Sequence, residues 1–297
     1  AAGRFTNAGA TAVMNIAMWN GANWSPLGDG LGQAATMDDS YDVRALAHDG
    51  TNLYAGGEFT TSGGLTVNRV AMWNGTNWTN LGTGLDDEVS ALLHDGRNLY
   101  AAGGFHTAGG VTAHRIAMWN GTSWTNLGSG MDFVVEALAH DGTNLYAGGS
   151  FTTAGGVAAS LVAKWDGANW SPLGSGITGN LVRDILFHGA DLYAGGWFTA
   201  AGGVPAANVA QWKTTIVTNE GVNPASGSWT GGYEVVIGGS NLGNGGDITN
   251  VTLCGVAASI QSQNAAQAVV LAGAAAAPGP GDVRVFSTSY GETVKSN

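Results

Sequence analysis

The stretch Val70-Ala71-Met72-Trp73-Asn74-Gly75 decides the fold, because it returns along the chain. It recurs as Ile116 to Gly121 and as Val162 to Gly167. Its tryptophan slot is filled five times, by Trp19, Trp73, Trp119, Trp165 and Trp212. The last four follow one another at intervals of 46, 46 and 47 residues, and the first interval of 54 residues carries an insertion. A period of about 40–50 residues without helical periodicity predicts the blades of a β-propeller.

Each repeat predicts four short strands separated by tight turns. In one repeat we expect strands at 89–94, 99–105, 115–119 and 124–127. Asp-Gly and Asn-Gly between apolar runs are strong hairpin signals, because both central residues of such a turn need a positive φ. The glycines of the Tyr-Ala-Gly-Gly strand predict that a neighbouring sheet approaches it closely.

The copies of two strands set the expected number of blades. The Gly-x-Phe strand occurs five times, at Phe5, Phe59, Phe105, Phe151 and Phe198. The first strand occurs four times, starting near Val43, Val89, Val134 and Val182. Five blades therefore fit, with one inner strand missing at the N-terminus, so closure of the ring needs a strand from elsewhere. Residues 214–218 are expected to supply the fourth strand of the last blade.

The repeats resemble the kelch-like repeats of secreted β-propellers. The shared pattern is Tyr-Ala-Gly-Gly-x-Phe, then Ile-Ala-x-Trp-Asn-Gly-x-x-Trp-x-x-Leu-Gly, and it covers residues 1–217. The resemblance implies a propeller domain over 1–217 and an extracellular or cell-surface location. It implies almost nothing about activity.

A different pattern begins after Trp212. Asn223-Pro224 leads to Gly231-Gly232, then to Val235-Val236-Ile237 and Gly239-Ser240-Asn241-Leu242. This segment resembles an IPT/TIG domain, which has an immunoglobulin-like fold, and we assign the domain to 218–297. Strands are expected at 248–254, 268–272 and 282–287. The predicted fold class is therefore all-β, an approximately five-bladed β-propeller followed by an immunoglobulin-like β-sandwich.

Members of that family usually end with one more apolar strand, which this sequence lacks. Together with the inner strand missing at the N-terminus, this means that both ends of the chain are expected to be short by one strand. An unpaired sheet edge invites another chain. Two readings stay open: a trimmed or partial sequence, and strand exchange or tandem linkage between subunits, which propagates head to tail into a filament.

Composition excludes several classes of partner. The formal net charge is −11 and charged residues make up only 10% of the chain, so no basic stripe is available for nucleic acid or for an anionic membrane. No apolar run reaches the length of about 18 residues that membrane insertion requires. The single cysteine, Cys254, excludes an intramolecular disulfide.

Most aromatic and acidic candidates have a structural explanation. The periodic tryptophans at 19, 73, 119, 165 and 212 are best explained by packing between blades, with stacking on glycans as the alternative. The repeated His48, His94 and His140, each before Asp-Gly, are expected to be turn residues, and His106, His114 and Trp197 surface residues. Residues that break the repeat are better interaction candidates, although a solvated loop is the simpler expectation: Asp38, Asp39, Tyr41, Asp86, Asp87 and Glu88.

Four sequons mark candidate N-glycosylation sites, at Asn74, Asn77, Asn120 and Asn250. Asn-Gly-Thr is also ordinary turn chemistry, so the pattern alone does not establish a glycan.

The sequence carries no hydrolase elbow, no His-Glu-x-x-His and no phosphate-binding loop. We therefore expect no enzymatic activity, no catalytic residue, no metal site and no cofactor. Two hypotheses remain. One is an extracellular structural or adhesive protein that self-associates into a homopolymer, as the repeating subunit of a surface fibre, sheath or appendage. The alternative is a lectin-like module that binds glycans or proteins.

Overall fold

The computed structural model describes residues 1–32, 42–189, 191–212, 222–223, 231–232, 234–239, 242–244, 246–264, 266–274 and 281–295. Over these residues the secondary structure is β-strand without a helix, which confirms the all-β class. The chain divides into two compact units, one formed by 1–172 and 180–185, the other by 173–179 and 186–297. The predicted domain boundary at 217/218 falls in a stretch outside the described residues, as do the predicted strand at 214–218 and the loop candidates Asp38, Asp39 and Tyr41.

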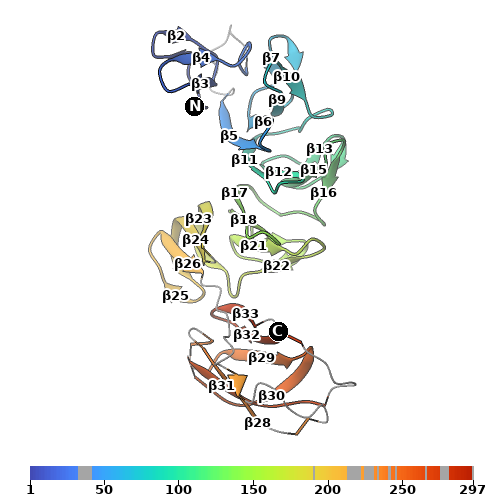
Figure 1. Ribbon diagram of the computed structural model, residues 1–297, viewed down its shortest axis with the longest axis vertical. Coiled ribbons are helices and arrows are strands. Elements are labelled where there is room, and N and C mark those ends of the chain that lie inside the picture. Colours follow the sequence, from blue (N-terminus) through green and yellow to red (C-terminus); the bar gives the residue numbers. More distant parts are fainter. Residues whose placement is uncertain are drawn as a thin grey trace. The chain divides into compact units, whose positions relative to one another are not determined.

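Three successive repeats in the first unit each form a four-stranded antiparallel meander (Figure 1). The first sheet contains β5 (Val43–His48), β6 (Leu53–Gly57), β9 (Val70–Trp73) and β10 (Trp78–Asn80). The second contains β11 (Val89–His94), β12 (Leu99–Gly103), β15 (Ile116–Trp119) and β16 (Trp124–Asn126). The third contains β17 (Val135–His140), β18 (Leu145–Gly149), β21 (Val162–Trp165) and β22 (Trp170–Pro172).

The four predicted strands of a repeat are all present, with differences at their ends: in the second sheet the second strand ends at Gly103, the third begins at Ile116 and the fourth ends at Asn126. Val135, not Val134, begins the first strand of the third sheet. The loop around each Gly-Gly pair is itself a small hairpin, β7 (Thr61–Ser62) with β8 (Leu65–Thr66), β13 (Thr107–Ala108) with β14 (Val111–Thr112), and β19 (Thr153–Ala154) with β20 (Val157–Ala158). These pairs were missed because two-residue strands have no recognisable periodicity.

The N-terminal repeat has fewer paired strands. β1 (Asn7–Ala8) pairs with β2 (Thr11–Ala12), and β3 (Ala17–Trp19) pairs with β4 (Trp24–Pro26). Residues 1–3 lie along β3, because the backbone of Ala1 bonds to Ala17 and that of Gly3 to Asn15. They therefore occupy the position that β6 holds in the next sheet. Among the described residues no first strand forms a ladder beside them, and one long backbone bond of 3.5 Å joins the Val43 N–H to the Gly3 carbonyl on that side.

Neighbouring sheets of the first unit meet through their first strands, because β5 lies beside β11 and β11 beside β17 (Figure 1). Val89 is fully buried, and its Cγ1 lies 2.5 Å from the position that a Cβ on Gly56 would occupy. Val182 approaches Gly148 in the same way, at 2.6 Å. The close approach predicted from the glycines is thus real. A ring of five blades remains a prediction.

A further sheet consists of β23 (Ile177–His188), β24 (Asp191–Ala201), β25 (Val204–Pro205) and β26 (Val209–Trp212). Residues 180–185 of β23 are assigned to the first unit and the rest of this sheet to the second. The second unit also contains a seven-stranded sheet in the order β27-β28-β31-β30-β29-β32-β33. Its core consists of apolar side chains that include Val235, Ile237, Val251, Val270 and Val285. The strands of that sheet are β27 (Val222–Asn223), β28 (Glu234–Gly238), β29 (Ile248–Leu253), β30 (Val256–Asn264), β31 (Gln267–Leu271), β32 (Val283–Ser287) and β33 (Gly291–Lys295).

The Asp-Gly turns are held by a repeated side-chain network, which gives a pH prediction. The Asp95 carboxylate accepts hydrogen bonds from the backbone of Arg97 and Asn98 and from the Tyr100 hydroxyl. Burial alone would raise the pKa of Asp95, but these bonds outweigh it and lower the pKa. Burial and the bond to Asp95 raise the pKa of Tyr100 to about 12. Asp49 with Tyr54 and Asp141 with Tyr146 repeat the pattern.

A lowered carboxyl pKa contributes stability that is present above the unfolded pKa of about 4 and is lost as the pH falls below it. A raised tyrosine pKa contributes stability that is lost as the pH rises from about 10 to about 12. We expect the urea midpoint to be flat between about pH 4 and 10 and to fall outside that window. Asp95→Asn should weaken the acid dependence and Tyr100→Phe the alkaline one, and unchanged profiles in both variants would contradict this explanation.

Candidate functional site

The three loop candidates within the described residues, Asp86, Asp87 and Glu88, make different contacts. Asp86 Oδ1 accepts hydrogen bonds from the backbone N–H groups of His106 and Thr107, both at 2.9 Å. Burial opposes the charge, but these backbone bonds lower the pKa of Asp86. Asp87 Oδ1 accepts from the backbone N–H of Glu88 at 2.8 Å. Asp86 and Asp87 therefore support loops, and only the Glu88 side chain reaches a neighbouring sheet, through Arg44.

A β-bulge recurs at the start of the first strand in three sheets. The register shifts between Val43 and Ala45, between Val89 and Ala91, and between Val135 and Ala137. The extra residues are Arg44, Ser90 and Glu136, and Arg183 takes the same sequence slot in β23. A bulge leaves its residue outside the regular pairing and re-aims its side chain. We call Arg44, Ser90, Glu136 and Arg183 the bulge row.

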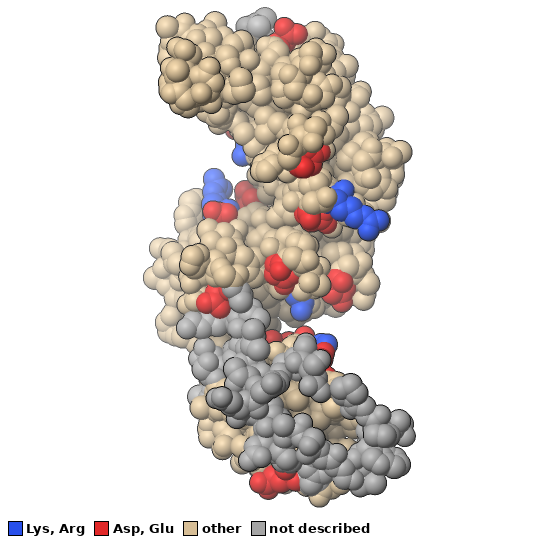
Figure 2. Space-filling view, in the orientation of Figure 1, with Lys and Arg blue, Asp and Glu red and all other residues tan. Residues whose placement is uncertain are grey.

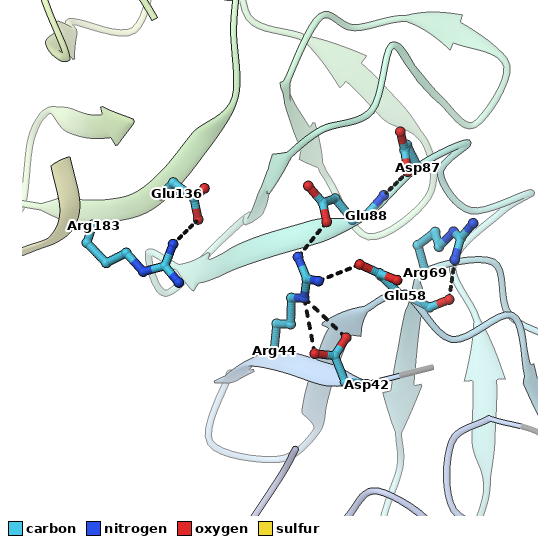
Figure 3. Close-up of polar contacts among 8 residues, drawn as sticks. All are labelled: Asp42, Arg44, Glu58, Arg69, Asp87, Glu88, Glu136 and Arg183. Atoms are coloured by element: carbon cyan, nitrogen blue, oxygen red, sulfur yellow. Dashed lines mark hydrogen bonds and ion pairs between the residues drawn. The ribbon is translucent and has the colours of Figure 1, made fainter. Parts of the chain in front are cut away.

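Arg44 is the centre of an ion-pair network that joins two sheets (Figure 3). Its Nε lies 3.1 Å from Asp42 Oδ1. Its two terminal nitrogens contact Glu58, which follows β6 in the same sheet, and Glu88, which precedes β11 in the next one. Arg69 contacts the backbone carbonyl of Glu58. One guanidinium thus holds three carboxylates from two repeats.

Negative charges outnumber positive ones in this network, because three carboxylates surround one arginine. Burial alone would lower the pKa of Arg44, but its three acidic partners raise it. Burial raises the pKa of Glu58, the Arg44 charge opposes the rise, and a hydrogen bond to Glu88 adds to it. The network is therefore a locally anionic patch whose repulsion Arg44 offsets.

The remainder of the bulge row is also polar. Arg183 Nη1 lies 3.9 Å from Glu136 Oε2 (Figure 3). The Ser90 hydroxyl is buried and has no hydrogen-bond partner among the described residues. Figure 2 shows acidic and basic side chains scattered singly or in small groups over a face that is otherwise uncharged. This arrangement can recognise complementary charge, and the part of the chain that the structure describes contains no group of three metal-ligating side chains.

The Arg44 network gives a prediction about charge balance. Arg44→Gln leaves Asp42, Glu58 and Glu88 facing one another, so it should cost about 1 kcal/mol or less at pH 7, because the groups are partly solvated. The cost should shrink near pH 4, where carboxylates bind protons. Arg183→Gln is the matched control: its single pair is long and its side chain is 66% exposed, so its effect should be negligible. Urea unfolding at both pH values measures the difference, and an Arg44→Gln cost that grew on acidification would refute this account.

The two periodic tryptophan slots differ in burial. The second slot lies five residues after the first and is filled by Trp24, Trp78, Trp124 and Trp170. Trp24 is half-buried, and the other three are at most 6% exposed. Each of these three donates its indole N–H to a leucine carbonyl of the preceding repeat, as Trp124 does to Leu81 at 2.9 Å. The first slot, which we singled out for packing, is less buried. Trp73, Trp119 and Trp165 lie half-buried over Gly28, Gly82 and Gly128 of the preceding repeat, and Trp212 lies half-buried over Gly174.

The remaining candidates lie at the surface. All four sequon asparagines, Asn74, Asn77, Asn120 and Asn250, are exposed. The Asn74 and Asn120 side chains each accept two backbone hydrogen bonds across their turn through Oδ1. That geometry leaves Nδ2, the atom that carries an N-linked glycan, outside the turn bonds. Glycosylation itself stays a prediction. Trp197 is 67% exposed, and Cys254 is exposed and unpaired.

Sequence reasoning missed Arg44, Glu58, Glu136 and Arg183 as possible functional residues. A signal was available, because the repeat aligns Arg44 with Ser90, Glu136 and Arg183, and Glu58 with Gly104, Ser150 and Trp197. Where equivalent positions hold different residue types in different repeats, packing between the sheets does not require a particular side chain. Which of them meet in space depends on how the sheets lie together.

Comparisons with known proteins bear mainly on the C-terminal segment. The family model of the IPT/TIG domain matches residues 218–297, so the chain carries a C-terminal immunoglobulin-like domain of this type. A search of curated proteins found no match. No helix long and apolar enough to cross a bilayer occurs among the residues that the structure places.

The solved structures to which the chain is similar include two of the extracellular domain of BT4673 from B. thetaiotaomicron, described as a putative one-component and as a putative hybrid two-component system. They are 13% and 11% identical to this chain, with TM-scores of 0.30 and 0.31. Each match covers 70% of this chain and 33% of the solved one, so the chain spans about a third of their length. A likeness this low carries no argument about fold or function.

Proposed function

We propose that the chain is a non-catalytic extracellular structural or adhesive protein that associates with further copies of itself into a surface fibre, sheath or appendage. The observation that carries the proposal is an exposed apolar surface on the N-terminal repeat, at the tryptophan slot that packs against another repeat elsewhere in the chain. In later repeats the first-slot tryptophan covers a glycine of the preceding repeat. Among the described residues Trp19 covers no glycine of another repeat. It is 49% exposed, and the neighbouring Met18 is 51% exposed.

Backbone pairing supports the same surface. Residues 1–3 bond to β3 on one side. On the other side, within the described residues, no strand forms a ladder with them, and their single backbone contact there is a long bond of 3.5 Å from the Val43 N–H of β5 to the Gly3 carbonyl. An extended segment from a second copy would fill there the place that β5 holds beside β6. Strand addition supplies backbone hydrogen bonds, and the exposed Met18 and Trp19 add apolar burial.

The test is the oligomeric state of the purified chain against concentration, by light scattering and negative-stain electron microscopy. We expect concentration-dependent oligomers or filaments that Trp19→Ser weakens. Trp197→Ser is the matched control, because it removes a tryptophan of even greater exposure from a different sheet. A monomer at every concentration, or equal loss of assembly in both variants, refutes self-association through this surface.

The second candidate is a carbohydrate-binding or protein-binding module. Trp197 favours it, because the corresponding slot holds Glu58, Gly104 and Ser150 in other repeats and packing therefore does not require tryptophan. An exposed indole face is suited to stacking on a sugar. Titration with neutral glycans should quench tryptophan fluorescence in the wild-type chain and not in Trp197→Ser; no quenching in either argues against this candidate.

A further inference from the structure

A hollow of about 390 Å³ opens between two consecutive repeats of the first unit. His106, His114 and Arg115 line it from one repeat, and Thr153 from the next. Ser129 and Asp132 line it from the segment that connects the two sheets. The volume lies in the lower part of the range of about 300–1,000 Å³ that is typical of small-molecule sites. The hollow is separate from the bulge row and from Trp19 and Trp197.

Its two histidines replace residues that the other repeats use. The His106 slot holds Thr60, Thr152 and Thr199 elsewhere, and the His114 slot holds Asn68, Ser160 and Ala207. Thr152 bonds to Asp132 through its backbone N–H and its hydroxyl. His106 bonds to the equivalent aspartate, Asp86, through its backbone N–H, and its side chain makes no bond of the kind that the Thr152 hydroxyl makes. The fold therefore does not require either imidazole, yet both lie at the same opening.

The two rings are close and are accompanied by a permanent cation. The ring centroids of His106 and His114 are 5.9 Å apart and the planes are at 89°. Arg115 Nη1 lies 3.0 Å from Nδ1 and 2.8 Å from Nε2 of His106. Arg115 Nη1 also donates to the carbonyl of Gly104 at 2.5 Å, and Arg115 Nε is buried without a hydrogen-bond partner among the described residues.

These contacts argue against a metal ion and for an anionic group. Both ring nitrogens of His106 already face a guanidinium, whose charge repels a second cation. Arginine with imidazole is suited to a carboxylate, which accepts charge-assisted hydrogen bonds. Asp132 adds an acceptor on the other wall: three donors from Thr152 and Thr153 use three of its approximately four lone-pair sites, which leaves room for one hydroxyl.

We propose that this hollow binds a sugar acid, a monosaccharide unit that carries both a carboxylate and hydroxyl groups. The carboxylate lies against Arg115 and His114, and the hydroxyls bond to Ser129 and Asp132. His106, held by Arg115, forms the wall between them. This site is independent of self-association and of Trp197, so its failure leaves both of those proposals unaffected.

The probes are glucuronate and galacturonate, with glucose and galactose as their neutral counterparts. Isothermal titration calorimetry at pH 7 should show the uronates binding at least about tenfold more tightly than the neutral sugars, a difference of about 1.4 kcal/mol. His106→Thr and His114→Ser place in these slots the residues that the next repeat uses, so both variants should fold and lose about tenfold in affinity. His48→Asn, at an exposed histidine outside the hollow, is the control and should bind normally.

A second readout is independent of the heat signal. In NMR spectra of the histidine side chains, glucuronate should shift His106 and His114 and leave His48 unchanged. No binding of either uronate overturns the proposal, as does equal binding of neutral and acidic sugars. Normal affinity in both His106→Thr and His114→Ser overturns the site even if a uronate binds elsewhere.

Discussion

Replacing Trp124 with alanine should lower the free energy of unfolding by about 3–5 kcal/mol. Trp124 is 3% exposed and packs in the apolar core that the second sheet shares with its neighbour. Removal of the indole leaves a cavity between repeats and takes away one of two hydrogen bonds at the Leu81 carbonyl, which accepts the indole N–H at 2.9 Å and the Gly84 N–H at 3.2 Å. Both effects act on the contact that joins consecutive repeats, so the urea midpoint should fall steeply.

Two variants separate these contributions. Trp124→Phe keeps most of the apolar volume and removes the hydrogen bond, so it should cost about 1–3 kcal/mol, less than alanine. Trp19→Ala is the exposed counterpart and should cost less than about 1 kcal/mol, because a side chain that is 49% exposed leaves no closed cavity. Trp119→Ala, at the half-buried slot, should fall between Trp124→Ala and Trp19→Ala. A loss below 1 kcal/mol for Trp124→Ala would mean that the repeats do not depend on this contact.

Gly103→Ala should be as damaging as a large cavity although it adds one methyl group. A Cβ at this position would lie 2.1 Å from the backbone carbonyl of Glu88, which accepts the hydrogen bond of Gly104. Backbone cannot move aside as a flexible side chain can, so the bulge itself must shift. We expect a loss of about 3 kcal/mol, at or above the upper end of the usual overpacking cost. A Cβ on Gly57 or Gly149 would meet the equivalent carbonyl of its own repeat, that of Asp42 or of Val134.

Gly195→Ala is the control, because its Cβ would meet nothing closer than 4.0 Å and because Ala102 already fills the equivalent slot of the second sheet. This variant should be nearly neutral in the same urea experiment. Equal stability of Gly103→Ala and Gly195→Ala would show that the bulge tolerates a side chain. The bulge row would then be free to move, and its role as a fixed charged surface would have to be abandoned.

The repeat defines what the surface can carry. Slots that hold the sheets together keep one residue type, as with the buried phenylalanines at 59, 105 and 151. Slots outside these contacts vary, and the bulge row, Trp197 and the histidines of the hollow all belong to them. This division favours a scaffold that presents different chemistry on successive, nearly identical sheets.

Local structure followed from the sequence by itself, because its causes lie within a few residues of one another. The period of 46 residues, the Asn-Gly and Asp-Gly turns and the alternating apolar strands gave the all-β class and the four strands of each repeat. The glycine, asparagine and valine pattern between 223 and 242 was enough to place the immunoglobulin-like domain, which the family model confirms. Short hairpins such as β13–β14 were not predicted from the sequence, since strands of two residues carry no periodic signal.

The tertiary structure alone decided which equivalent slots meet. Trp119 and Trp124 recur with the same period, so the repeat does not tell which of the two is buried. In the structure it is Trp124 that is buried and donates a hydrogen bond to the preceding repeat. Arg44 and Glu88, 44 residues apart, meet because a bulge turns Arg44 toward the next sheet, and His106 meets His114 because a hairpin folds between them. Distances across sheets depend on twist, bulges and packing, and a linear sequence does not state those directly.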